Sequence, residues 1–290
     1  RAAIEGGATG GLDRSLRESW IEDVDFRPGY LKHLSSLFDV KAIKKARMRV
    51  GIDAMHGSAR TYLRPLLESM GVEVVALNED RDVLFGGRSP EPTPESLKEL
   101  AGIMVKKKLN LGLACDGDAD RFGILDAGGK WISANDVLAL AVEHLVVNRG
   151  LRGKVARSVM TSHFVDAVAK SHGLDTRETP VGFKYIGELL RTGQYLLGGE
   201  ESGGMSIQGH VPDKDGLLAC ALMLELVAVE GKPLAAVRDR LFKKVGAFHN
   251  IRLNYKLERM REMMELQERL HVKPPLDLAG RWVDSQHAYR

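Results

Sequence analysis

The 290-residue sequence contains only two cysteines, few aromatic residues (6%) and no apolar run of about 18 residues. Cys115 and Cys220 lie far apart and belong to no CxxC or Cys/His cluster, which argues against a disulfide framework or a zinc site. Residues 1–11 contain no apolar core of the kind found in signal peptides. We therefore expect no membrane partner, buried thiols, and a cytoplasmic location.

Strong charge of one sign is also missing, because the formal net charge is +3 and the lysines and arginines are scattered. The basic runs 41–49 and 106–108 fall at expected helix ends, where a solvated surface is the simplest interpretation. No nucleic-acid partner is expected. Hydrophobic residues (44%) and charged residues (28%) are balanced as in ordinary globular proteins, and the length suggests about two domains.

Short apolar runs alternate with segments of helical periodicity, which predicts parallel α/β units. The expected strands cover 48–53, 72–77, 109–115, 122–125, 155–160, 174–178 and 195–197. The expected helices cover 27–38, 57–70, 94–107, 135–147, 164–170, part of 181–191, and 217–229. The rhythm restarts after Gly128 and Gly129. The predicted fold class is α/β, with two consecutive domains that have mixed, mostly parallel sheets.

The domain division follows from these patterns. Residues 1–12 are small and glycine-rich and are expected to be a linker. The first domain is predicted over 13–130 and the second over 131–247. Residues 248–290 contain a strand-like run and a charged helix near 258–270, and are expected to be a strand-helix linker leading into a further unit that this chain lacks.

Three aspartates alternate directly after an apolar strand: Asp116, Asp118 and Asp120. Open α/β sheets bind ligands at this edge, where the strands end. A turn through Gly117 and Ala119 would let the three carboxylates face one centre, as Mg²⁺ requires. The adjacent Arg121 could pair with a phosphate beside the metal.

Other interpretations of this segment fit less well. An EF-hand loop starting at Asp116 fails, because Arg121 and Ala127 stand where glycine and glutamate are needed. A phosphatase with an aspartyl nucleophile would use Asp-x-Asp after a strand, but the third aspartate and the adjacent arginine fit it poorly. An acidic surface turn without an ion is disfavoured, because three carboxylates at one strand end repel each other.

A second segment, 196–204, follows a strand and is rich in glycine and glutamate. Glu200 and Ser202 are separated by one residue and can hydrogen-bond neighbouring hydroxyls of a sugar. The paired glycines permit close approach of a ligand to the backbone. A plain glycine-rich connection with exposed glutamates is an equally simple alternative.

Further candidates for substrate binding lie in three places: the strand-to-helix turn 179–184, whose free N–H groups could bind phosphate, a lysine just before an apolar helix, and an arginine on a strand. They are Val181, Gly182, Lys184, Lys214 and Arg157. Each has a simpler alternative: a plain loop, a solvated lysine or an exposed strand residue.

Taken together and in this order, the segments 116–121, 179–184, 199–203 and 214–216 resemble the α-D-phosphohexomutase family of phosphoglucomutases and phosphomannomutases. Residues 53–57 also resemble the opening of that family's second domain. The family has four domains, and the similarity implies that this chain holds the second and third. The family's phosphoserine loop, with its Ser-His-Asn pattern, and its final phosphate-binding loop have no match here.

The resemblance also implies roles for these residues. Mg²⁺ would be the cofactor, held by the three aspartates and by the phosphoserine that this chain lacks, with Arg121 catalytic beside the phosphate. Glu200 and Ser202 would hold a hexose phosphate, with glucose favoured, while Lys214 approaches from the same side. At position 181 glucose-specific relatives often carry threonine rather than valine.

The implied reaction moves phosphate between the 1- and 6-oxygens through a phosphoserine and a hexose 1,6-bisphosphate. Two alternatives stay open. One is a non-catalytic fragment that binds sugar phosphate and Mg²⁺, and the other is a metal-dependent phosphatase.

Overall fold

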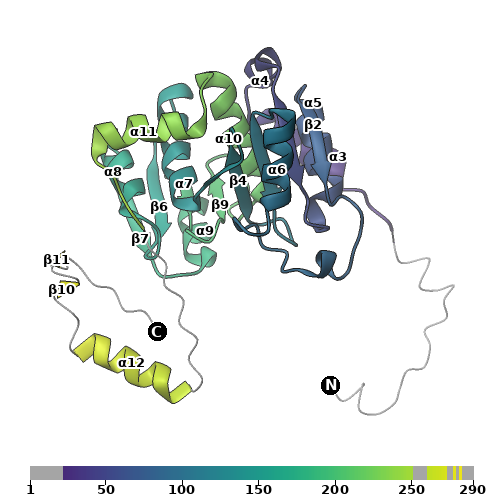
Figure 1. Cartoon of the computed structure of the whole chain (residues 1–290). Helices are drawn as coiled ribbons and strands as arrows, with labels where there is room; N and C mark the ends of the chain where they lie inside the picture. The colour runs from purple at the N-terminus through teal and green to yellow at the C-terminus, as the bar shows by residue number, and fades with distance from the viewer. Residues whose placement is uncertain (1–21, 251–259, 273–276, 279–280, 283–290) are drawn as a thin grey trace, which may run out of the picture.

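The computed structural model describes residues 22–250, 260–272, 277–278 and 281–282 (Figure 1). The linker predicted over 1–12 and most of the strand-like run expected after residue 248 lie outside these residues. No helix in the described ranges is both long and apolar enough to cross a lipid bilayer.

The first sheet has five strands in the order β2-β1-β3-β4-β5. Strand β1 is parallel to β2 and β3, while β4 is antiparallel to β3 and to β5, so that four of the five strands share one direction. The strands are β1 (Arg49–Asp53), β2 (Glu73–Leu77), β3 (Leu111–Cys115), β4 (Phe122–Asp126) and β5 (Lys130–Ile132).

Helices cover both faces of this sheet, and the side chains of β3 pack against helices on both faces. Leu111, Leu113 and Cys115 belong to the main core on one face, and Ala114 belongs to a smaller core on the other, because successive side chains of a strand alternate. The first-sheet helices are α3 (Arg27–Ser36), α4 (Val40–Ala46), α5 (Leu63–Ser69) and α6 (Lys98–Lys107), with 3-10 turns η1 (Ser58–Thr61) and η2 (Phe85–Gly87).

The second sheet has four strands in the order β7-β6-β8-β9, with β6 parallel to β7 and β8 and with β9 antiparallel at the edge. Its strands are β6 (Lys154–Ser158), β7 (Thr176–Thr179), β8 (Tyr195–Gly199) and β9 (Met205–Ile207). The helices that follow the first sheet are α7 (Ala134–Glu143) with a π-helical turn η3 (His144–Asn148), α8 (His163–Ser171), α9 (Phe183–Arg191), α10 (Gly216–Glu230) and α11 (Leu234–Val245). Farther along the chain are α12 (Met260–Val272), β10 (Asp277–Leu278) and β11 (Arg281–Trp282).

Helix α10 joins the two halves of the molecule (Figure 1). Twelve of its fifteen residues are buried, and it contacts β3 and β4 of the first sheet as well as α7 and β9 of the second half. A helix that is apolar on all sides is expected to be surrounded by protein. Its Cys220 neighbours Cys115, and this contact, together with burial, raises the pKa of the Cys115 thiol. Two cysteines that are distant in sequence therefore meet beneath the end of β3.

The predicted α/β class with mostly parallel strands is confirmed, and so is a charged helix near 258–270, now seen as α12. The single helix predicted over 57–70 is wrong. That segment forms η1 and then α5, because Ser58 N donates to Gly117 O and holds a neighbouring loop instead of starting an α-helix. The prediction missed α4, α11, β5 and β9, and α6 begins at Lys98 rather than at residue 94. The missed strands have only three residues each, which is too short for a visible alternation.

A buried carboxylate also ties the halves together. Asp126, at the end of β4, is 1% exposed, and its Oδ1 and Oδ2 accept from Leu234 N and Ala235 N at 2.9 Å each. These are free N–H groups in the first turn of α11, so a residue of the first sheet caps a helix of the second half.

Replacing this cap is expected to destabilise the protein. Asp126→Ala should lower the free energy of unfolding by about 1–2 kcal/mol, because two N–H groups lose their acceptor. Urea denaturation followed by circular dichroism measures this change. The control Asp239→Ala removes an exposed carboxylate whose partner among the described residues is its neighbour Arg238, and should stay within about 0.5 kcal/mol of the wild type. Equal stability of the two variants would contradict the capping role.

Candidate active site

The three predicted aspartates converge in a turn, residues 116–121, which we call the carboxylate loop. Asp116, Asp118 and Asp120 each offer a carboxylate oxygen, and these oxygens lie within 4.8 Å of one another. Ala119 has φ +67°, its N–H donates to Asp116 O, and Arg121 N donates to Oδ1 of Asp116 at 2.9 Å. This tight turn directs the alternating side chains to one side.

The clustering has an electrostatic cost. Burial above all, and then the charges of Asp118 and Asp120, raise the pKa of Asp116 to about 6, although the hydrogen bond from Arg121 N lowers it. A divalent cation would remove the repulsion among the carboxylates. Three carboxylates, of which Asp116 is buried, Asp118 exposed and Asp120 half-buried, form a donor set that fits a hard cation such as Mg²⁺, which prefers oxygen ligands and keeps room for water or phosphate.

From the first half of the chain, backbone contacts hold the carboxylate loop on one side. Gly117 N donates to Pro90 O at 3.0 Å, and Ser58 N donates to Gly117 O at 2.9 Å. Gly57 approaches so closely that a Cβ there would lie 2.6 Å from Gly117 O. Any side chain at position 57 would push the loop away.

From the second half, the loop is held by the start of α10 and by residues 199–204, which we call the glutamate loop. Phe122 N donates to Gly203 O at 3.1 Å, and Gly216 N donates to Ala119 O at 3.0 Å. A Cβ at Gly216 would lie 2.4 Å from Arg121 O. The structure thus brings together the two segments that the sequence singled out separately.

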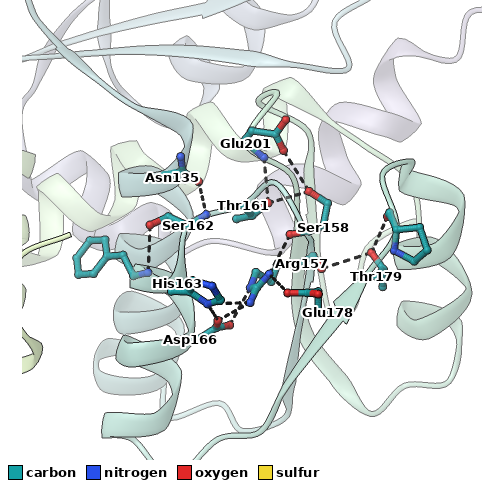
Figure 2. A network of polar contacts seen from close by, with 12 residues as sticks. Asn135, Arg157, Ser158, Thr161, Ser162, His163, Asp166, Glu178, Thr179 and Glu201 are labelled. Carbon is teal, nitrogen blue, oxygen red and sulfur yellow. Dashed lines mark hydrogen bonds and ion pairs between the residues drawn. The ribbon is translucent and has the colours of Figure 1, made fainter. Parts of the chain in front are cut away.

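The two glutamates of the glutamate loop anchor it in different directions. Glu200 is 6% exposed, and its Oε1 accepts from Gly182 N at 2.9 Å. Gly182 has φ +122°, a conformation that favours glycine. Glu201 turns toward the end of β6, where its Oε2 accepts from Ser158 Oγ and its N–H donates to Thr161 Oγ1 (Figure 2).

Lys214 and Arg121 place positive charge at the carboxylate loop. Lys214 Nζ lies 2.5 Å from Asp120 Oδ2, and its side chain is 20% exposed, so it is not a freely solvated lysine. Arg121 Nη1 lies 3.1 Å from Glu91 Oε1, and its Nε lies 3.8 Å from Asp120 Oδ1. Ser202 is half-buried in the adjacent glutamate loop.

Other predicted substrate-binding residues are placed differently. Arg157 is 4% exposed, and its guanidinium donates to Asp166 and to Glu178 (Figure 2). The alternative of an exposed strand arginine is therefore wrong, but this guanidinium is occupied within the protein. Val181 is 56% exposed, and Lys184 lies over the ring of Tyr185 with Nζ 4.9 Å from its centroid. Substrate binding by these residues stays a prediction.

Local sequence patterns did not indicate the hydrogen-bond network next to Lys214, which centres on Asp215. Asp215 Oδ1 accepts from Leu217 N and Leu218 N, while its Oδ2 accepts from Tyr30 Oη at 2.7 Å and lies 2.8 Å from His210 Nε2. Burial alone would raise the pKa of Asp215, but these hydrogen bonds lower it below its ordinary value. The position of Asp215 at the start of an apolar helix could have indicated the helix cap. The hydrogen bond from Tyr30 could not be predicted from local patterns, because Tyr30 is 185 residues away.

Comparison with known protein families gives two adjacent matches. Residues 28–129 match the model of phosphoglucomutase/phosphomannomutase alpha/beta/alpha domain II, and residues 133–245 match that of domain III. Both matched segments contain parts of the site described above.

Individual relatives agree with these matches. A phosphoglucomutase/phosphomannomutase of Thermococcus kodakarensis is 33% identical over 214 residues, which are 74% of this chain and 47% of that protein. A solved structure of parafusin, a phosphoglucomutase of Paramecium, in its open form has a TM-score of 0.70 and 30% identity, over 78% of this chain and 43% of that chain. A solved structure of a Thermus thermophilus protein assigned as a phosphomannomutase has a TM-score of 0.73 and 31% identity, over 78% of this chain and 52% of that chain. The chain spans about half the length of the curated relatives it matches.

Removing one carboxylate should weaken metal binding. Asp118→Ala is expected to lower the affinity for Mg²⁺ at least about tenfold, because an exposed ligand is lost without disturbing the buried turn. Isothermal titration calorimetry measures this affinity. Asp175→Ala, which removes an exposed carboxylate just before β7, should bind Mg²⁺ as the wild type does. If Asp118→Ala also binds as the wild type does, the metal assignment is wrong.

The raised pKa of Asp116, caused by burial first and then by the charges of Asp118 and Asp120, predicts a stability effect with a defined pH dependence. Without metal, Asp116→Asn should raise the free energy of unfolding at pH 7.5 by about 1 kcal/mol, allowing for screening by solvent at the more exposed neighbouring carboxylates. The wild-type carboxylate is penalised above pH 6. As the pH falls from about 6 toward 3.8, the folded protein takes up the proton and the penalty disappears. The gain should therefore shrink to nothing near pH 4 in EDTA-containing urea titrations. A gain that is independent of pH would exclude this cause, and Asp175→Asn serves as the control.

Proposed function

This chain belongs to the phosphoglucomutase/phosphomannomutase family, and we propose that it forms the metal-binding and sugar-binding walls of a phosphohexomutase. The reaction would interconvert hexose 1-phosphate and hexose 6-phosphate, an isomerisation by phosphoryl transfer. The observation that supports this most strongly is the backbone pairing of the two loops: Arg121 of the carboxylate loop forms an antiparallel bridge with Gly204 of the glutamate loop, and the next residue, Phe122, donates its N–H to Gly203 O. A metal and a sugar bound at these loops would be neighbours.

We further propose the division into a domain over 13–130 with the carboxylate loop, a domain over 131–247 with the glutamate loop, and a connecting segment over 248–290. The family-model matches at 28–129 and 133–245 are compatible with this division. The serine that carries the phosphate would come from outside these residues, because the sequence contains no Ser-His-Asn pattern.

In the proposed mechanism, Mg²⁺ bound by Asp116, Asp118 and Asp120 would supply the positive charge that neutralises a phosphate during transfer. Arg121 would bind a phosphate beside this site, because a guanidinium can donate two parallel hydrogen bonds to phosphate oxygens. Its contact with the exposed side chain of Glu91 is a surface ion pair that phosphate could replace at little cost.

Glu200 and Ser202 would hold the sugar through hydroxyl groups that lie between its two phosphate ends. The same contacts can form when the sugar is turned around between the two transfer steps, because those hydroxyls are present in both orientations. The hydrogen bond from Gly182 N fixes the Glu200 carboxylate in advance, which reduces the entropy lost on binding. Gly182 would thus act through Glu200, with Val181 and Lys184 at the exposed rim of the same turn.

Glucose phosphate is the favoured substrate in this proposal, because residues 199–202 (Gly-Glu-Glu-Ser) resemble phosphoglucomutases, whereas glucosamine mutases more often carry glutamine at position 201. The Glu201 carboxylate accepts a hydrogen bond from Ser158 Oγ, which ties the glutamate loop to the end of β6. The proposed location is the cytoplasm, in keeping with two buried free thiols, and neither nucleic acid nor membrane is a proposed partner.

The test uses the 290-residue chain with Mg²⁺, glucose 1-phosphate and glucose 1,6-bisphosphate. We expect Mg²⁺-dependent binding of the bisphosphate by calorimetry, without formation of glucose 6-phosphate. Formation of glucose 6-phosphate would contradict the claim that the phosphate-carrying serine lies outside these residues. Release of inorganic phosphate would favour the phosphatase, and absence of any sugar-phosphate binding would refute the proposed walls.

Glu200→Gln in the same assay should weaken bisphosphate binding about tenfold, because a hydrogen bond to a charged acceptor is lost while the shape is kept. The matched control Glu188→Gln changes an exposed glutamate of α9 and should bind as the wild type does.

A further inference from the structure

The ammonium of Lys214 lies directly on one of the predicted metal ligands. Its Nζ is 2.5 Å from Asp120 Oδ2, and the two side chains are 20% and 29% exposed. Partial shielding from solvent makes this pair stronger than an ordinary surface ion pair. Lys214 therefore neutralises part of the charge that makes the carboxylate loop costly.

The position of this lysine is defined by the fold. Its side chain crosses the glutamate loop at Gly204, where an added Cβ would lie 2.4 Å from its Cδ and 2.8 Å from its Cγ. Next to it, Asp215 N donates to Met205 O, and the Asp215 side chain caps α10. The backbone next to Lys214 is thus fixed by the hydrogen bond from Asp215 N, and its ammonium is held by Asp120.

Within the described part of the chain, two positively charged side chains lie near Asp120, and they differ in their other partners. Arg121 shares its guanidinium between Asp120 and Glu91, at 3.8 and 3.1 Å. Lys214 has Asp120 as the one carboxylate that its ammonium contacts among the described residues. Its charge is therefore the one that a metal ion bound to Asp120 would displace most directly.

We propose that Lys214 is a resident counterion of the carboxylate loop, which competes with a divalent metal ion for Asp120 and is released toward a substrate phosphate when the metal binds. This inference rests on the metal site of the proposed function. An ammonium and a dication on one carboxylate repel each other, so metal binding weakens the hold of Asp120 on Lys214. The released charge stays beside the metal, so metal and phosphate binding should strengthen each other.

Competition predicts an unusual result, since deleting a charged side chain at the site should improve metal binding. Lys214→Met is expected to bind Mg²⁺ about tenfold more tightly than the wild type in calorimetry at low salt. Lys170→Met removes the same charge from an exposed lysine in the last turn of α8, and should leave the affinity unchanged. Equal affinity in Lys214→Met and the wild type would overturn the proposal, and so would weaker binding, which would show that Lys214 instead orients Asp120 for the metal.

A second variant tests the same idea with all charges kept. Gly204→Ala should push the Lys214 side chain off its path and also tighten Mg²⁺ binding, though by less. Circular dichroism and thermal melting check that each variant folds, and Gly204→Ala decides the question if Lys214→Met does not fold. Unchanged affinity in Gly204→Ala would count against the counterion role.

The release toward phosphate has its own measurement. Glucose 1,6-bisphosphate is titrated into each protein with and without Mg²⁺. The gain in affinity caused by Mg²⁺ should be larger in the wild type than in Lys214→Met, and an equal gain would overturn the release.

Failure of this inference can be told apart from failure of the proposed function. If the wild type binds no Mg²⁺, or if Asp118→Ala binds it equally well, the metal site itself is wrong and both proposals fall. If Asp118→Ala loses Mg²⁺ while Lys214→Met gains nothing, only the counterion role is wrong.

Discussion

Backbone hydrogen bonds across the carboxylate loop hold the candidate site together. On one side Ser58 N and Pro90 O bind Gly117, and on the other Gly203 O and Gly216 N bind the segment from Ala119 to Phe122. These contacts require very short approaches between main chains, which is why a Cβ at Gly57 or Gly216 would collide with the loop. Residues from both halves of the chain are thus needed to hold three like charges in one turn.

That arrangement has an energetic consequence. Burial, and then the charges of Asp118 and Asp120, raise the pKa of Asp116, so the ionised carboxylate of Asp116 destabilises the fold. Lys214 offsets part of this destabilisation, because its ammonium contacts Asp120. The position of Lys214 depends on Gly204 and on the capped start of α10. Charge repulsion maintained by surrounding structure is typical of sites that bind an ion or perform chemistry. The three aspartates and Lys214 therefore belong to one electrostatic unit.

Much of this could be predicted from local patterns. The alternation of aspartates after an apolar strand, the glycine-glutamate segment and the strand-helix rhythm are all short-range signals, and they indicated the α/β class and the two loops. Where a segment serves a distant partner, local patterns were misleading. Residues 57–70 form a turn and a shorter helix because the turn binds Gly117, and Arg157 is buried because Asp166 and Glu178 surround its guanidinium.

The sequence by itself determined which side chains are available and in what order: three carboxylates on one turn, a glutamate and a serine between glycines, and an apolar helix that had to be buried on all sides. Only the tertiary structure decided that the two loops touch, that Lys214 reaches Asp120, that Tyr30 bonds to Asp215, and that Cys115 meets Cys220. The physical reason is that these contacts join residues up to 185 positions apart. They form because α10 packs against both halves, and such packing leaves no trace in the spacing of neighbouring residues.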